Sequence, residues 1–460
     1  MKNFLLFLLF FVLVPPALRS QTLRQKIGQM VMVTFTGDSL EKNSASLDTL
    51  KSDIAEGLIG GVTYFTWSNN LQSPAQIKNL SKQLQQRSSI PLLIAVDQEG
   101  GRVARLSKSN GFASTQSAYQ LGTVINKESK TREQASLMAG WLSQSGINTN
   151  FAPVADINVN PNSPAIGALD RSFSSNADSV VLHTTWFCDE MHKKNIFTAS
   201  KHFPGHGSAK SDSHLGFTDI TATWADSELI PFQSLINQHS VDMVMTGHLF
   251  NRTIDSVYPA SLSASAVTSL LRNQMKFNGV VITDAMGMGA ITNNYGFAES
   301  IVLAVNAGVD ILLYTTNLDS LNRSLARTIV SLIEEKVAGG EISITRINDA
   351  YQHIMTLKNK LTPAAVQSSQ HQVPAQYSLG SYPNPFNGAV TIQFSLPRVM
   401  EVRVTIYDML GRKVEEILNE EVSSGKNYIR WNAQPYPSGI YFAQLQIDGH
   451  LFTQKLVYIK

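Results

Sequence analysis

The segment 201–214, KHFPGHGSAKSDSH, brings together the residue types that proteins use for proton transfer. It holds three of the ten histidines of this 460-residue chain, and Asp212 precedes His214 by two positions. In an extended loop, side chains two apart project to the same side, so we expect this carboxylate and this imidazole to meet. A carboxylate beside a histidine fixes the tautomer and raises the basicity of the ring, which suits a group that donates and accepts protons.

A zinc site is the alternative interpretation of the same histidines, because imidazole is a common zinc ligand. A second cluster of cysteine or acidic residues at ligand spacing is not evident, and Cys188 is the single cysteine of the chain. The sequence therefore favours acid–base chemistry over metal binding. We expect no metal and no organic cofactor.

Other polar residues stand where apolar runs end. Asp97 closes the run IAVD, Lys201 and His202 close TASKH, and Asp284 closes GVVITD, while His248 follows VMTG. For any one of them, a polar group satisfied by loop backbone is as good an explanation as catalysis. Several on the carboxyl-end rim of a parallel barrel indicate an active site, because catalytic residues of barrel enzymes lie on that rim.

The elements that would position these residues alternate along residues 24–360. Helical patterns occur, for example, at 176–194, 261–276, 317–336 and 342–361. The eight predicted strands cover residues 30–35, 59–65, 91–97, 149–156, 196–202, 241–246, 279–284 and 308–314. Eight strands, most of them followed by a helix-sized segment, favour an α/β fold of the (β/α)8 TIM-like barrel type over an open doubly wound sheet.

The composition changes after the last helical stretch. Residues 362–378, TPAAVQSSQHQVPAQYS, are polar, contain proline and have no period, which is typical of a linker. Residues 379–460 contain the short alternating runs VTIQFSL, EVRVTIYDM, KNYIRW, GIYFAQLQI and TQKLVYI, separated by turn residues. We therefore predict a barrel at 21–361, a linker at 362–378 and a small all-β sandwich at 379–460.

The first twenty residues have the pattern of a secretory signal peptide. Lys2 precedes an apolar run from Phe4 to Val14, and a short stretch with prolines and small residues follows before Gln21. The run is shorter than the roughly 20 apolar residues of a spanning helix, so we expect no stable membrane span.

The chain has 37 lysine and arginine residues and 35 acidic residues, with no basic cluster, so nucleic acid is not an expected partner.

Three long motifs together resemble glycoside hydrolase family 3, specifically its single-barrel β-N-acetylhexosaminidase branch. They are VDQEGGRVARL from Val96, KHFPGHG with the DSH that follows it, and ITDAMGMGA from Ile282. The resemblance covers about residues 24–360. It implies that Asp284 is the nucleophile and that His214 is the general acid/base, assisted by Asp212. The substrate-binding positions that it implies are Asp97, Arg105, Arg171, Lys201 and His202.

The resemblance implies a retaining, exo-acting enzyme that hydrolyses terminal N-acetyl-β-glucosaminides by double displacement. Its expected partners are N-acetylglucosamine-containing oligosaccharides or glycan fragments. A histidine acid/base on the barrel's own loop, without an α/β domain after the barrel, favours these substrates over glucosides. Three alternatives stay open: a family 3 β-glucosidase, an N-acetylglucosaminide phosphorylase, and a non-catalytic surface glycan-binding protein.

The C-terminal segment resembles the sorting domain of the type IX secretion system. The resemblance rests on YPNPFN from Tyr382 and on the later runs IYDMLGRKV, PSGIYFAQL and QKLVYIK. It implies that export machinery is a partner and that the protein is secreted or held at the cell surface, with the periplasm as the alternative. A carbohydrate-binding sandwich is the competing interpretation, and its sugar platform would use Tyr407, Trp431, Tyr436 and Tyr441.

Overall fold

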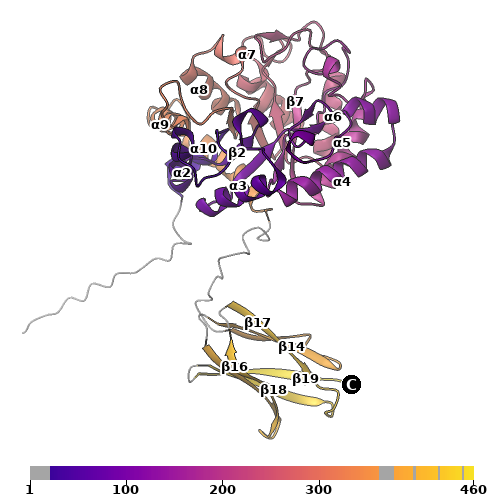
Figure 1. Ribbon diagram of the computed structural model, residues 1–460, viewed down its shortest axis with the longest axis vertical. Helices are drawn as coiled ribbons and strands as arrows, with labels where there is room; N and C mark the ends of the chain where they lie inside the picture. Colours follow the sequence, from indigo (N-terminus) through magenta and orange to yellow (C-terminus); the bar gives the residue numbers. More distant parts are fainter. Residues whose placement is uncertain (1–20, 362–377, 397–399, 423–424, 448–449) are drawn as a thin grey trace, which may run out of the picture. The chain divides into compact units, whose positions relative to one another are not determined.

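The computed structural model describes residues 21–361, 378–396, 400–422, 425–447 and 450–460. The chain divides into two compact units between Thr362 and Pro363 (Figure 1). The predicted signal peptide at 1–20 and residues 362–377 of the predicted linker lie outside the described residues. Among the residues that are described, no helix is both long enough and apolar enough to cross a membrane.

Eight parallel strands form the centre of the first unit. They are β1 (Val31–Val33), β2 (Gly61–Tyr64), β3 (Leu93–Val96), β6 (Thr149–Asn150), β7 (Phe197–Phe203), β9 (Met243–Thr246), β11 (Val280–Thr283) and β12 (Leu312–Tyr314). Their order in the sheet is β11-β9-β7-β6-β3-β2-β1-β12. A parallel bridge between Ile282 and Ile311 joins the two edges, so the sheet nearly closes on itself. The predicted barrel is confirmed, and each predicted strand overlaps one observed strand.

The barrel strands are short, continuous apolar runs because both of their faces are covered. Every residue of β3 (LIAV) and of β11 (VVIT) is buried. Side chains of one face fill the barrel interior, and those of the other face contact the surrounding helices. The interior is therefore a packed core, and polar chemistry is confined to the ends of the strands.

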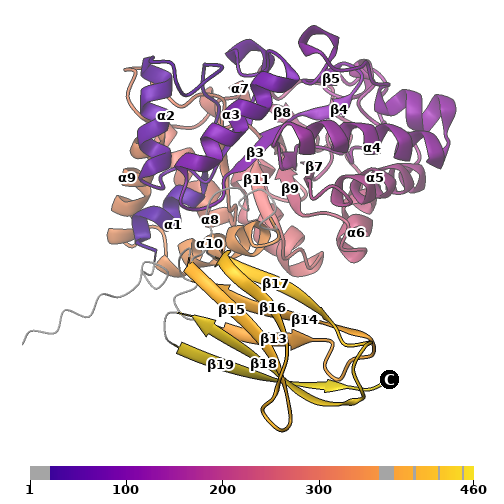
Figure 2. The same ribbon diagram turned by 60° about the horizontal axis from the view of Figure 1, so that its bottom comes forward.

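Helices connect the strands and lie around the barrel (Figure 2). They are α1 (Leu23–Gln29), α2 (Ala45–Ala55), α3 (Pro74–Arg87), α4 (Glu128–Gln144), α5 (Ala177–His192), α6 (Ile230–Asn237), η8 (Ser265–Gln274), α8 (Phe297–Ala307), α9 (Leu325–Ala338) and α10 (Ile344–Lys358). Many begin where the sequence supplies a capping side chain: Ser44, Ser73 and Asn176 each accept a hydrogen bond from a backbone N–H of the first turn.

The predicted helix at 317–336 begins later than expected, at Leu325. The side chain of Asn317 instead donates to the backbone oxygen of Ser46 at 2.7 Å, and the hydroxyl of Ser324 caps the helix. Polar residues at 317–324 thus form a loop rather than the first turns, since their side chains compete with helical hydrogen bonds.

The second unit is all β and consists of two antiparallel sheets. One has the order β13-β14-β17 and the other β16-β15-β18-β19. The strands are β13 (Ser378–Tyr382), β14 (Ala389–Leu396), β15 (Met400–Asp408), β16 (Lys413–Val422), β17 (Gly425–Asn432), β18 (Gly439–Ile447) and β19 (His450–Tyr458). A shared core takes Ile392 and Trp431 from the first sheet and Ile406 and Leu456 from the second. The predicted all-β sandwich is confirmed.

Strands β13 and β16 escaped the sequence prediction, and β13 begins at Ser378, which was predicted to end the linker. The side chains of β16 do not alternate between apolar and polar. Its sequence, KVEEILNEEV, is glutamate-rich, and no residue of it is fully buried.

The competing interpretation of this unit was a sugar platform built from four aromatic residues. Two of them, Trp431 and Tyr441, are only 1% and 5% exposed and belong to the core. These two rings are therefore not available to stack on a sugar.

Candidate active site

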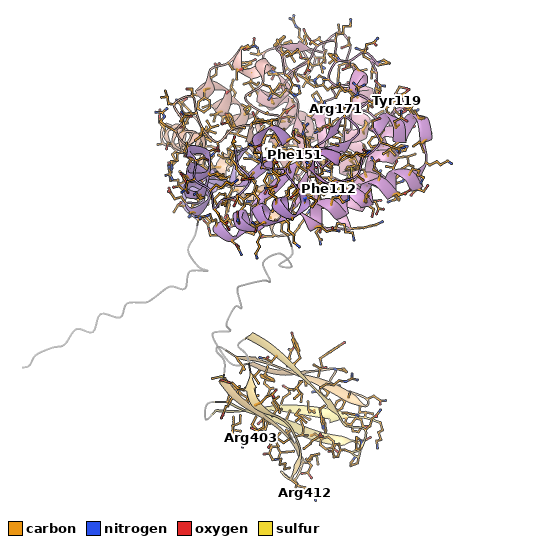
Figure 3. The ribbon with its side chains drawn as sticks, viewed as in Figure 1. Phe112, Tyr119, Phe151, Arg171, Arg403 and Arg412 are labelled. Carbon is orange, nitrogen blue, oxygen red and sulfur yellow. The ribbon has the colours of Figure 1, made fainter. Side chains whose placement is uncertain are left out.

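The predicted site residues gather at the carboxyl ends of the barrel strands. Asp97 directly follows β3, Lys201 and His202 lie near the end of β7, and Asp284 directly follows β11. Arg171, labelled in Figure 3, comes from the loop after β6. Parallel pairing brings these strand ends to one rim, as the sequence predicted.

A buried network of charges forms one wall of this rim. The Lys201 ammonium lies 2.7 Å from Asp97 Oδ1 and 2.7 Å from Glu99 Oε1. Arg171 donates from Nε and Nη2 to the two oxygens of Glu99 at 2.9 and 2.8 Å. Burial alone would raise the pKa of Glu99, but Arg171 and Lys201 hold it well below its usual range. Lys201 and Arg171 are thus held in place by charge-assisted hydrogen bonds to buried carboxylates.

Arg105 extends this network outward. Its guanidinium lies 3.6 Å from Asp97 Oδ2 and 5.3 Å from the ring centre of Phe65.

Sequence reasoning missed Glu99, which stands two residues after Asp97 in VDQEGG. The predicted cations Lys201 and Arg171 were the signal that could have found Glu99. Buried cations require paired anions, and Glu99 is an acidic residue close to Asp97 in the chain.

His202 is held by Asp156, a carboxylate that closes the predicted strand 149–156. Asp156 Oδ2 lies 2.7 Å from His202 Nδ1, and Asp156 Oδ1 accepts from the backbone N–H groups of His202 and His206 at 3.1 and 2.7 Å. His202 Nε2 lies 3.2 Å from Arg171 Nη2. Because arginine only donates, the contact with Arg171 requires Nε2 to accept, and Nδ1 then carries the proton toward Asp156. Asp156 ends its predicted strand, as Asp97 and Asp284 end theirs, a signal that sequence reasoning left unused.

Asp284 differs from the other carboxylates of the rim. Its Oδ1 accepts from the backbone N–H of Ala285 at 2.8 Å, and no lysine or arginine of the described chain forms an ion pair with it. Burial would raise the pKa of Asp284, but the imidazoles of His202, His248 and His214, once protonated, lower it to about 2. The carboxylate is thus ionised and free of a neutralising side chain, as a nucleophile requires.

Asp212 and His214 form the pair expected from their spacing. His214 Nδ1 lies 2.7 Å from Asp212 Oδ1, which also accepts from the backbone N–H of His214 at 2.9 Å. These contacts outweigh the effect of burial and lower the pKa of Asp212. The His214 side chain is 58% exposed, and because Asp212 engages Nδ1, Nε2 is the ring nitrogen left for a substrate.

The loop that carries this pair rests on the segment after Asp284. Backbone N–H groups of Gly289 and Ala290 donate to the carbonyl oxygens of His214 and Ser213, each at 3.2 Å. A side-chain contact of 3.1 Å between His206 Nε2 and Ser213 Oγ ties the same loop to its own base. These contacts bring the backbone of the loop that bears His214 against the segment that follows Asp284, and His214 is one of the imidazoles that lower the pKa of Asp284.

The remaining candidate features do not converge on another centre. The three histidines of the 201–214 segment have separate partners, Asp156, Ser213 and Asp212. No group of three or more His, Cys, Asp or Glu side chains that could hold a metal occurs within the described ranges.

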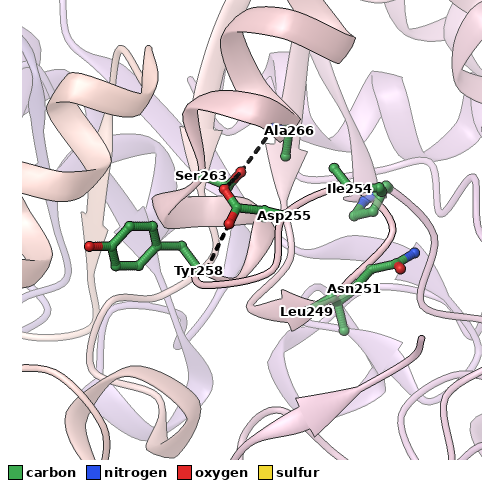
Figure 4. A pocket seen from close by; sticks show the side chains of 9 residues that line it. Leu249, Asn251, Ile254, Asp255, Tyr258, Ser263 and Ala266 are labelled. Carbon is green, nitrogen blue, oxygen red and sulfur yellow. Dashed lines mark hydrogen bonds between the residues drawn. The ribbon is translucent and has the colours of Figure 1, made fainter.

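The pocket in Figure 4 is lined by Pro204 and by residues of the segment 249–266, which follows β9, and contains none of the predicted site residues. Its carboxylate, Asp255, is already satisfied by Ser263 Oγ at 2.6 Å and by backbone N–H groups.

Residues 22–357 match the model of the glycosyl hydrolase family 3 N terminal domain. The chain belongs to glycosyl hydrolase family 3. The family expected from three sequence motifs is confirmed. This family 3 chain is 30% identical over 416 residues to beta-hexosaminidase A of Pseudoalteromonas piscicida, covering 83% of its own length and 67% of the relative.

Two solved structures resemble the family 3 barrel. A glycoside hydrolase family 3 beta-N-acetylglucosaminidase from Paenibacillus aligns with a TM-score of 0.68 and 33% identity, covering 78% of this chain. The alignment spans 65% of that protein, slightly under two thirds. A beta-N-acetylhexosaminidase from Beutenbergia cavernae aligns with a TM-score of 0.65 and 27% identity, covering 74% of this chain and 99% of the other.

The second unit of this family 3 protein has a match of its own. Residues 381–460 match the model of a secretion system C-terminal sorting domain. A domain of this kind suggests export out of the cell or to the cell surface.

Proposed function

We propose that this family 3 protein is a retaining, exo-acting β-N-acetylhexosaminidase that removes terminal N-acetyl-β-glucosaminides from glycan fragments. The observation that carries the proposal is the Asp212–His214 pair on a loop that docks against the segment following Asp284. This arrangement supplies a proton donor and an ionised nucleophile at one barrel mouth. The names of the similar hexosaminidases support the same substrate class.

In the first step, Asp284 attacks the anomeric carbon and forms a glycosyl–aspartate ester. Protonated His214 delivers its Nε2 proton to the leaving glycosidic oxygen as that bond breaks. Asp212 holds the ring through Nδ1 and stabilises the imidazolium. A histidine in this role avoids placing a second anion beside the nucleophile.

In the second step, water replaces the leaving group. Neutral His214 removes a proton from the water as its oxygen attacks the anomeric carbon, and the ester bond to Asp284 breaks. Two inversions at the same carbon retain the configuration. The site returns to its starting charge state without a metal or an organic cofactor.

The charged wall would hold the terminal sugar. Lys201 uses two of its three N–H donors on Asp97 and Glu99, which leaves one for a sugar hydroxyl or for the acetamido carbonyl. Asp97 retains acceptor capacity for hydroxyl groups, and Arg105, Arg171 and His202 line the same wall. Because these groups are fixed by one another, little side-chain entropy is lost when a sugar binds.

The substrate class is tested with two aryl glycosides. We expect the purified protein to hydrolyse an aryl N-acetyl-β-glucosaminide at least tenfold faster than the matching β-glucoside. Replacing Asp284 with Asn should abolish this turnover while the thermal unfolding curve stays near that of the wild type. Turnover near the wild-type rate in the Asn variant would contradict the nucleophile role.

The same assay separates the alternatives. A sugar 1-phosphate that forms only when phosphate is added would identify a phosphorylase, and a preference for the glucoside would identify a β-glucosidase. Binding of glycans without any product over long incubation would identify a non-catalytic surface protein.

We place the mature enzyme outside the cell or on its surface, exported by type IX machinery that reads the C-terminal unit. The sorting-domain match at 381–460 supports this destination. Detection of the intact chain only in the periplasm would contradict it.

A further inference from the structure

A large aromatic side chain stands exposed at the rim of the candidate active site. Trp67 is 60% exposed and lies in the short 3-10 turn η2 (Thr66–Ser68) that follows β2. Its ring stacks on that of Phe65, with 5.2 Å between ring centres and 27° between ring planes. Phe65 supports one part of the indole, and much of the remainder faces solvent.

The turn that carries Trp67 is held firmly by buried polar side chains. Asn70 Oδ1 accepts from the backbone N–H of Phe65 at 2.9 Å, and its Nδ2 donates to the carbonyl of Phe35 at 3.0 Å. The buried Ser68 hydroxyl donates to the carbonyl of Phe65 at 2.9 Å. Because these contacts fix the backbone on both sides of Trp67, the indole is presented in a set orientation before any ligand binds.

A chain of contacts joins this aromatic stack to the charged wall of the site. Strands β2 and β3 pair with Tyr64 opposite Val96, so Phe65 and Asp97 leave the barrel side by side. The Arg105 guanidinium lies 5.3 Å from the Phe65 ring centre and 3.6 Å from Asp97 Oδ2. The exposed indole is therefore continuous, through Phe65 and Arg105, with the groups that would hold the terminal sugar.

We propose that Trp67 is the platform of an outer sugar-binding subsite, which holds a residue of the oligosaccharide beyond the charged wall that would bind the terminal sugar. This inference rests on the proposed hexosaminidase function. The face of a pyranose ring presents C–H groups to the electron-rich indole face, while the hydroxyls at its edge stay in water. An exposed, rigid indole at the rim matches that chemistry.

The occupant is a β-linked N-acetylglucosamine oligosaccharide rather than a protein. A stable protein interface buries roughly 800 Å² on each partner, far more than a single indole and its supporting ring supply. One sugar ring is close to the size of the indole face. The continuity with Arg105 and Asp97 also places this surface along the path of a chain whose terminal sugar is bound at the charged wall.

The test compares a long substrate with a short one in the full-length protein. For each variant, kcat/KM for tri-N-acetylchitotriose is divided by kcat/KM for an aryl N-acetyl-β-glucosaminide, which contains a single sugar. We expect this ratio to fall about tenfold in Trp67→Ala, mainly through KM, which corresponds to about 1.4 kcal/mol. Trp67→Phe should recover most of the loss, because a flat ring remains.

Leu182→Ala is the matched control. Leu182 is 50% exposed on α5, which lies on the outside of the barrel, and its substitution removes a similarly exposed apolar side chain. The ratio should not change in this variant. An unchanged ratio in Trp67→Ala, with wild-type turnover of both substrates, would overturn the outer subsite and leave the proposed function standing.

A binding measurement keeps the inference testable without turnover. Calorimetric titration of Asp284→Asn protein with tri-N-acetylchitotriose should give a Kd that rises about tenfold when Trp67→Ala is added. Equal affinities with and without the indole would overturn the proposal. Failure of the wild type to hydrolyse the aryl substrate would instead contradict the proposed function, so the two failures are distinct.

Discussion

At the scale of single residues, charge pairing distinguishes the carboxylates of the barrel mouth. Asp97 and Glu99 each contact Lys201, and Asp156 is engaged by His202 and by two backbone N–H groups. Asp284 is the carboxylate of this rim that accepts from a neighbouring backbone N–H and is not neutralised by a cationic side chain of the described residues. The paired groups can hold a sugar, and the unpaired one can attack it.

The acid role of His214 predicts a dependence on the leaving group. His214→Ala should reduce kcat/KM for oligosaccharides by about 10²- to 10⁴-fold, because their leaving oxygen needs a proton. The loss for an activated nitrophenyl glycoside should be much smaller, since that leaving group departs as an anion. Steady-state kinetics with both substrates provide the measurement. Equal losses for the two would argue against proton donation by His214.

Glu228 predicts a pH dependence of stability. This buried carboxyl lies behind the loop after β7, where its Oε2 accepts from the backbone N–H of Ser208 at 3.3 Å and its Oε1 has no hydrogen-bond partner among the described residues. Burial raises the pKa of Glu228 from 4.5 to about 7. Between these values the folded state binds more protons than the unfolded state, so this group's contribution to stability is full below pH 4.5 and is lost as pH rises through 7.

Glu228→Gln should remove this pH dependence. As pH rises from 5 to 8, we expect the variant to gain stability relative to the wild type, because the wild-type carboxyl loses its proton and a neutral amide has no proton to lose. Urea titrations at several pH values measure this difference. A difference that does not vary with pH would show that Glu228 is ionised in the folded protein.

At the scale of elements, two backbone segments meet to assemble the site. The loop after β7 carries the Asp212–His214 pair, and the segment after β11 supplies the N–H groups of Gly289 and Ala290 that dock it. A Cβ atom on Gly289 would lie 2.8 Å from the carbonyl oxygen of Leu215 and 3.1 Å from that of His214. The close approach of the two segments thus depends on a missing side chain.

Gly289→Ala should therefore displace the loop and lower kcat/KM by up to about 10²-fold, because small displacements of a catalytic group are costly. The thermal unfolding midpoint should change little. Gly287→Ala is the control from the same segment, since its Cβ would meet only the Thr315 hydroxyl at 3.9 Å. Equal kinetics for the two variants would contradict docking by close approach.

At the scale of the whole molecule, the two units have separate hydrophobic cores. The barrel core and the sandwich core share no residues. The residues proposed for catalysis all lie in the first unit, and the second unit matches a sorting domain. Catalysis and export can therefore be changed independently.

Trp431→Ala should destabilise the sandwich by about 3 to 5 kcal/mol, because it empties a large volume in that core. Differential scanning calorimetry should show one transition moved and one unchanged, with kcat/KM near the wild-type value. Tyr428→Ala, on the same strand but 63% exposed, is the control and should move neither transition. A fall in barrel stability in Trp431→Ala would show that the units unfold together.

The sequence by itself determined the order and type of most elements. Apolar runs of strand length alternating with amphipathic stretches predicted all eight barrel strands, because the barrel buries both faces of each strand. The same patterns placed Asp97, Lys201 and Asp284 at strand ends and paired Asp212 with His214, since these relations are local. Strands β13 and β16 were missed, and the exposed, glutamate-rich residues of β16 carry no alternating pattern.

The tertiary structure alone decided which distant groups touch. Glu99 between Arg171 and Lys201, Asp156 beneath His202, and the docking of His214 beside Gly289 each join residues from different strand ends. Closure of the barrel creates these contacts, and no spacing along the chain records them. Charge balance in a buried site depends on through-space distances, so its partners become known only when the strands are placed around one axis.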